Sequence, residues 1–143
     1  MATAFPPPPA MPFVHPDDMP QLYALRGTGR CMEPVINDGA LLTFDKEQAP
    51  EPGDVVGLVF SHAYAQRWGA PGCVKRLKMA LPPPIFSRAF DGLVVVEQIN
   101  PPRTYTFRTS DVLAAHKCVG HAEPDPDNKG RARFRLKQEA PRC

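Results

Sequence analysis

Short runs of apolar, β-branched and aromatic residues follow one another along this chain, and turn-forming residues separate them. Six such runs predict strands, at residues 21–26, 40–45, 54–60, 73–79, 92–98 and 103–107. The breaks between them hold prolines and glycines, which fit neither a helix interior nor a central strand. The pattern therefore predicts a mainly β fold.

Two later segments extend this pattern. Ser110 and Asp111 fit the start of a helix through 112–115, whereas residues 112–121 also fit a strand, so both readings stay open. From 131 to 137 the chain alternates, with one face made by Arg131, Arg133, Arg135 and Lys137 and the other by Ala132, Phe134 and Leu136. We interpret this segment as a half-buried edge strand protected by charge, in preference to a nucleic-acid contact.

The proline distribution suggests how the chain is divided. Residues 1–20 hold Pro6 to Pro9, Pro12, Pro16 and Pro20, which predicts an extended arm of polyproline type. We expect one folded domain over 21–122, followed by a basic strand and tail over 123–143, because 143 residues suit a single core. A long connection at 61–72 carries Trp68, which we expect to pack over the mouth of the fold rather than to contact a partner.

Composition and charge exclude several classes of protein. A net charge of +2 is too small to indicate a nucleic-acid or membrane partner. No apolar run approaches the roughly 18 residues of a membrane span, and the N-terminus lacks the pattern of a secretion signal, so we expect a cytoplasmic protein. The four cysteines and four histidines are scattered without metal-ligand spacing, so we expect reduced thiols, no metal and no cofactor.

Four ordered segments carry a resemblance to a known family. They are Gly-Arg-Cys-Met-Glu-Pro-Val-Ile-Asn-Asp-Gly at 29–39, the run at 40–46, Pro-Gly-Asp-Val-Val at 52–56 and Val-Lys-Arg-Leu at 74–77. With weaker markers at 100–101 and 119–120, they resemble the LexA/UmuD/signal-peptidase-like serine peptidases over residues 21–122. The resemblance implies a small, partly open antiparallel barrel-like domain of the LexA C-terminal type, with little helix.

The same resemblance implies a catalytic pair. Cys31 stands where the family has its nucleophilic serine, and Lys75 stands where it has its catalytic lysine. A lysine acts as a base only when apolar surroundings disfavour its charged form, and strand alternation places Lys75 on one face with Cys73, Leu77 and Met79. The backbone N–H groups of Arg30 and Cys31 are the candidates for stabilising an oxyanion.

The cysteine at position 31 leaves two functions open. A thiol is a better nucleophile than a hydroxyl, so a Cys/Lys peptidase or regulator in an SOS- or phage-repressor-type response is one reading. The other is an inactive dimerisation module that binds a related repressor or polymerase partner. The resemblance implies a stand-alone protein that forms a homodimer. We expect it to bind no nucleic acid directly, because residues 1–20 hold no helix-turn-helix pattern. We expect no self-cleavage, because the 30 residues before Cys31 lack an Ala-Gly or Cys-Gly bond. A reversible Cys31–Cys73 disulfide is a further hypothesis.

Overall fold

The computed structural model of the chain describes residues 15–83, 91–124 and 134–137. Antiparallel strands dominate it, as the sequence pattern predicts, and the sheet is not closed. The strands are β1 (Leu22–Arg26), β2 (Leu41–Asp45), β3 (Val55–Phe60), β4 (Gly72–Leu77), β5 (Leu93–Gln98), β6 (Arg103–Arg108), β7 (Val112–Pro124) and β8 (Phe134–Lys137). One α-helix, α1 (His62–Trp68), and two 3₁₀ turns, Pro16–Asp18 and Thr109–Asp111, complete the described part.

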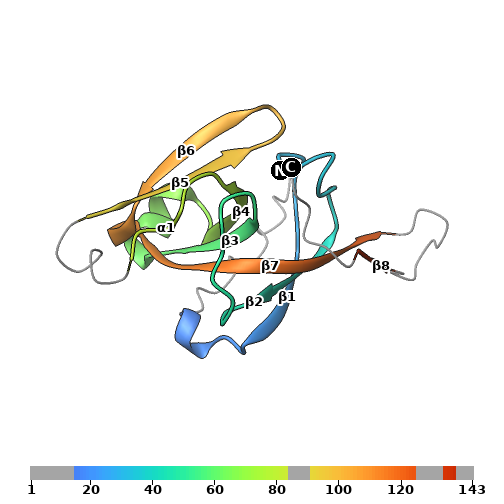
Figure 1. The fold of residues 1–143 in the computed structure, drawn as a ribbon, viewed down its shortest axis with the longest axis horizontal. Coiled ribbons are helices and arrows are strands. Elements are labelled where there is room, and N and C mark those ends of the chain that lie inside the picture. The colour runs from blue at the N-terminus through green and yellow to red at the C-terminus, as the bar shows by residue number, and fades with distance from the viewer. Residues whose placement is uncertain (1–14, 84–90, 125–133, 138–143) are drawn as a thin grey trace, which may run out of the picture.

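The order of the strands in the sheet is β1-β2-β7-β3-β4-β5-β6, and β8 pairs with β7. Figure 1 shows the long β7 crossing the molecule, with β1 and β2 toward one end and β3 to β6 with α1 toward the other. Every neighbouring pair is antiparallel. All six predicted strands are present, with ends that differ by one or two residues. Residues 110–121, for which the sequence allows either a helix or a strand, form the end of a 3₁₀ turn and then β7.

The core is divided between two apolar clusters, and β3 contributes to both. Val55 belongs to the first cluster, with Met32, Ile36, Ala40, Leu42, Phe44 and Cys118. Val56, Leu58 and Phe60 belong to the second, with Leu77, Val94, Val96 and Phe107. Because successive strand residues point to opposite faces, a strand that is covered on both faces must be apolar throughout, and every residue of β3 is buried.

Helix α1 covers the second cluster and is the element that the strand pattern does not predict. Ser61 caps its start by accepting a hydrogen bond from the Tyr64 N–H at 3.3 Å. Gly69 ends it in the left-handed conformation, with φ of 90°. Tyr64, Ala65 and Trp68 pack onto the second cluster, so Trp68 covers the core, as expected.

The two ends of the described chain also contact the sheet. Of the expected N-terminal arm, residues 15–20 are described, and they form a 3₁₀ turn held by Lys46, whose Nζ donates to the carbonyls of Pro16 at 2.6 Å and Met19 at 2.9 Å. Of the predicted basic strand, Phe134–Lys137 forms β8 on the end of β7. Residues 131–133 lie outside the described residues.

Candidate active site

The loop at 27–40 between β1 and β2 presents Cys31. Its two ends are tied together, because the Gly27 N–H donates to the Ala40 carbonyl at 2.8 Å and the Gly39 N–H donates to the Gly27 carbonyl at 2.9 Å. Gly29 has a φ of 94°, a backbone conformation that favours glycine, and its N–H donates to Asp38 Oδ1 at 2.9 Å. Met32 and Ile36 anchor the loop in the first cluster, so Cys31 lies on a fixed turn.

Strand β4 brings Lys75 to the same place. Lys75 pairs with Val56 of β3, and cross-strand partners share a face, so the lysine lies on the side of the second cluster. Its exposed fraction is 5%, which excludes the alternative of an ordinary surface lysine. Leu77 is buried on this face as predicted, but Met79 lies beyond the end of β4 and is 59% exposed. The prediction that Met79 helps to cover the lysine is therefore wrong, because the strand ends two residues earlier.

The Lys75 ammonium nitrogen lies 3.3 Å from the sulfur of Cys31, within hydrogen-bond distance for a sulfur acceptor. The two residues are 44 positions apart in sequence and come from different elements. The ring of Tyr105 on β6 provides a second contact, with its centroid 5.7 Å from Lys75 Nζ. A thiol, an amine and an aromatic face therefore meet where the two core clusters adjoin.

The turn between β5 and β6 fixes the backbone of Cys31. The N–H groups of Ile99 and Asn100 both donate to the Cys31 carbonyl, at 3.0 Å and 2.8 Å. The side-chain amide of Asn100 donates to the Arg30 carbonyl at 3.3 Å. The carbonyls of the two residues at the expected oxyanion site are thus both held by this turn.

The backbone N–H groups of Arg30 and Cys31 are the donors that the sequence predicts for an oxyanion site. Among the described residues, neither the Arg30 nor the Cys31 backbone N–H donates a hydrogen bond within the chain. In an oxyanion site, such donors must point at the reacting carbonyl and lack an internal acceptor. The arrangement is consistent with the predicted use of both groups.

Cys73 lies on β4 two residues before Lys75. Burial raises the pKa of its thiol to about 12, the Lys75 ammonium opposes this shift, and Cys31 adds to it. Cys73 therefore responds to the charges of both members of the pair, while its own thiol stays protonated at neutral pH. Cys31, Cys73 and Cys118 are all free thiols in the structure.

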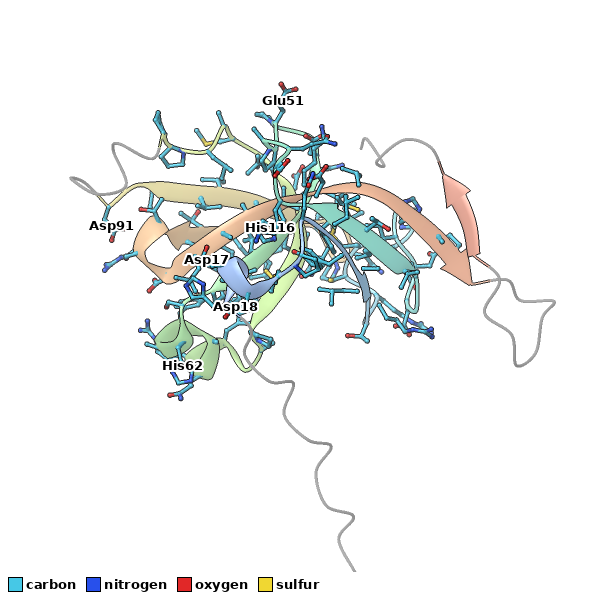
Figure 2. The ribbon with its side chains drawn as sticks, turned by 90° about the horizontal axis from the view of Figure 1, so that it is seen from below. Asp17, Asp18, Glu51, His62, Asp91 and His116 are labelled. Atoms are coloured by element: carbon cyan, nitrogen blue, oxygen red, sulfur yellow. The ribbon has the colours of Figure 1, made fainter. Side chains whose placement is uncertain are left out.

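Several ionisable residues outside the pair are spread over the described part of the chain. Figure 2 shows Glu51, His62 and Asp91 at separate places around the molecule, whereas His116 lies among the strands. Over residues 15–83, 91–124 and 134–137, no group of three or more His, Cys, Asp or Glu side chains is arranged to hold a metal ion. Within the same ranges, no helix has the length and apolarity needed to cross a bilayer.

Sequence analysis did not predict three residues that surround the pair as part of the site. They are Gln98, Asn100 and Tyr105, which come from β5, from β6 and from the turn between them. The contacts of Asn100 with the Cys31 loop and of Tyr105 with Lys75 join residues far apart in sequence, so no local pattern indicates them. The strand assignment did place them on one hairpin, and the family marker at 100–101 includes Asn100, but neither signal assigned a role in the site.

The described domain is mainly β and places the amine of Lys75 within hydrogen-bond distance of the sulfur of Cys31. A family model described as Peptidase S24-like matches residues 4–80, which is just over half of the chain and includes both Cys31 and Lys75. The chain belongs to this family, in agreement with the resemblance found in its motifs. Neither a comparison with curated proteins nor a comparison with solved structures gave a significant match.

Proposed function

We propose that the chain is a peptidase that uses Cys31 as nucleophile and Lys75 as its proton-transfer partner. The observation that carries this proposal is the 3.3 Å contact between Cys31 Sγ and Lys75 Nζ, made by a lysine that is 5% exposed. A buried ammonium needs a partner of opposite charge, and a thiolate at Cys31 supplies one. Family membership supports the choice of reaction.

The reaction follows from the two groups. The Cys31 thiolate attacks the peptide carbonyl carbon, and the N–H groups of Arg30 and Cys31 stabilise the resulting oxyanion. The carbon–nitrogen bond then breaks, the leaving amine takes a proton from the Lys75 ammonium, and a thioester remains. Neutral Lys75 next accepts a proton from water as the water attacks the thioester, and cleavage of the carbon–sulfur bond restores the thiolate and the ammonium.

The proposed setting is an SOS- or phage-repressor-type response in which the protein, as a homodimer, cleaves a LexA-type repressor or another protein in trans. This setting rests on the motif resemblance. A second candidate function follows from the residue at position 31, because the family's usual serine is replaced and a site shaped for oxygen tolerates a larger sulfur poorly. In that case the chain is an inactive module that binds the repressor or a polymerase partner without cutting it.

Cleavage and thiol reactivity together separate the two functions. The purified chain is incubated with a LexA-type repressor, and the reaction of iodoacetamide with Cys31 is followed by peptide mass spectrometry. We expect fragments of the repressor, their loss in Cys31→Ala and Lys75→Met, and alkylation of Cys31 slowed about tenfold or more by Lys75→Met.

Lys78→Met is the matched control, because Lys78 is exposed and its Nζ contacts Thr104 Oγ1 at 3.2 Å, away from the cysteine. Repressor that is bound but not cleaved, with Cys31 alkylation unaffected by Lys75→Met, would instead establish the inactive module. A Cys31→Ser variant that cleaves when the natural chain does not would show that the fold retains the machinery and that the sulfur alone blocks it.

A further inference from the structure

The hairpin formed by β5 and β6 contacts both members of the Cys31–Lys75 pair. Its turn holds the Cys31 carbonyl through the N–H groups of Ile99 and Asn100. Its second strand places the ring of Tyr105 against the Lys75 ammonium. One hairpin therefore controls the position of the sulfur and of the nitrogen.

The Tyr105 ring is held from several sides. Trp68 meets it edge-on with centroids 5.6 Å apart, and Phe107 stacks beside it at 6.2 Å. The Tyr105 hydroxyl donates to Gln98 Oε1 at 3.3 Å. Arg103 also lies over the ring, at 5.9 Å from its centroid, but Arg103 is exposed, whereas Lys75 is buried. The ring is a fixed surface for the buried ammonium.

A chain of hydrogen bonds connects this ring to the nucleophile. The Gln98 side-chain amide donates to the carbonyls of Pro101 at 3.1 Å and Asn100 at 3.4 Å. The Asn100 N–H in turn donates to the Cys31 carbonyl at 2.8 Å. Tyr105, Gln98 and Asn100 thus form a continuous path from the lysine's aromatic neighbour to the cysteine's backbone.

We propose that Tyr105 is a positioning residue, which holds the Lys75 ammonium against Cys31 Sγ with the face of its ring and is itself held by Gln98. The inference rests on the proposed function, because it concerns the reactivity of the same pair. The lysine side chain has four rotatable bonds, so the 3.3 Å contact requires something to restrict it. The electron-rich ring face attracts the cation and leaves the sulfur side open.

The test is the rate at which iodoacetamide alkylates Cys31 in the full chain, read by peptide mass spectrometry. Tyr105→Leu removes the ring face, and we expect alkylation to slow by about threefold to tenfold. Tyr105→Phe keeps the ring face, which Trp68 and Phe107 still hold, and loses only the hydrogen bond to Gln98. We therefore expect its alkylation rate to fall by no more than about twofold. Should Tyr105→Leu fail to fold, Tyr105→Met also lacks the ring and carries the same expectation.

Tyr64→Leu is the matched control. Tyr64 belongs to the same aromatic cluster, 6.2 Å from Trp68 and 5.8 Å from Phe107, and it lies on α1. A general loosening of the cluster would slow alkylation equally in Tyr64→Leu and Tyr105→Leu, and that result would overturn the inference. Retention of the natural rate in Tyr64→Leu supports it.

A double-mutant cycle tests whether Tyr105 affects the alkylation of Cys31 through Lys75. In a Lys75→Met background, we expect Tyr105→Leu to change the alkylation rate by less than about twofold, because the ring no longer has an ammonium to hold. The same slowing in both backgrounds would overturn the inference and leave the proposed function intact. If Lys75→Met alone does not slow alkylation, the proposed function fails, and the inference fails with it.

Discussion

Asn100 donates its backbone N–H to the carbonyl of Cys31 at 2.8 Å, and the same residue reaches the preceding carbonyl, that of Arg30, with its side-chain amide. Two peptide groups next to the candidate nucleophile are therefore oriented by one residue from another hairpin. A side-chain substitution removes only the bond to Arg30, because the bond to Cys31 is made by the backbone.

Asn100→Ala removes the side-chain bond alone. Because that bond is exposed, we expect the free energy of unfolding to fall by about 0.5 to 1 kcal/mol, measured by urea titration. Asn37→Ala is the control, since Asn37 lies in the 27–40 loop and its side chain makes no hydrogen bond among the described residues. Equal losses in the two variants would contradict the assigned contribution of Asn100.

Gly72→Ala tests how closely β4 approaches β3. A Cβ at Gly72 would lie 2.1 Å from the backbone oxygen of Leu58, so one of the two strands must shift. We expect a loss of about 3 kcal/mol or more in the free energy of unfolding. At Gly27 an added Cβ would lie 3.5 Å from its nearest neighbour, so Gly27→Ala should change stability by less than about 1 kcal/mol. A mild effect at Gly72 would show that the strands pack less tightly than described.

The sequence predicts the strands well because their signal is local. Residues 55–60 form a run without polar side chains after the turn residues Pro52, Gly53 and Asp54, and β3 is buried on both faces as such a run requires. The helix at His62–Trp68 was missed although Ser61 and Gly69 are good capping residues, since seven residues are too few for a clear helical period. The strand alternation within 73–79 fails at Met79, because the tertiary structure ends the strand at Leu77.

Within the site, the sequence predicts the Cys31–Lys75 pair but not the residues that surround it. Cys31 and Lys75 lie in recognisable motifs, and strand alternation indicates which face the lysine occupies. The contacts of Tyr105 and Asn100 depend on how the β5–β6 hairpin folds across the loop at 27–40, which no local pattern encodes. The same is true of the burial of Cys73, which changes the chemistry of its thiol.

The free energy of unfolding should decrease at high pH because of two buried side chains that resist losing their protons. Burial raises the pKa of Cys118 to about 11 and, together with the Cys118 charge, that of Tyr23 to about 12. The folded chain keeps these protons when the unfolded chain has already lost them, so the contribution of these two groups to stability is fully present below about pH 9 and is lost as the pH rises toward 11 and 12. Urea titrations at several pH values measure this fall.

Cys118→Ala isolates one contribution to the alkaline fall. Between about pH 9 and 11, the decrease in the free energy of unfolding should be smaller in this variant by roughly 1 to 3 kcal/mol. Below pH 9 the pH dependence of the two chains should coincide, apart from a constant cost for the lost side chain. An unchanged slope above pH 9 would mean that the Cys118 thiol ionises as readily folded as unfolded.

Cys73 should remain a reduced and unreactive thiol. With its pKa raised to about 12, it carries on the order of a thousandfold less thiolate at neutral pH than a thiol of ordinary pKa. Peptide mapping without reductant should therefore find Cys31 and Cys73 unlinked, and iodoacetamide should reach Cys31 first. A linked pair of peptides that disappears in Cys73→Ala would establish the disulfide instead.

In the described sheet, β4 and β5 pair at two positions, Arg76 with Glu97 and Leu77 with Val96, whereas β5 and β6 pair at six. Separating the hairpin from β4 therefore breaks fewer backbone pairings than separating β5 from β6. We expect warming to disable the site before the molecule denatures. Amide hydrogens of Ile99 and Asn100 should exchange with solvent at temperatures where that of Val56, opposite Lys75 in the centre of the sheet, is still protected.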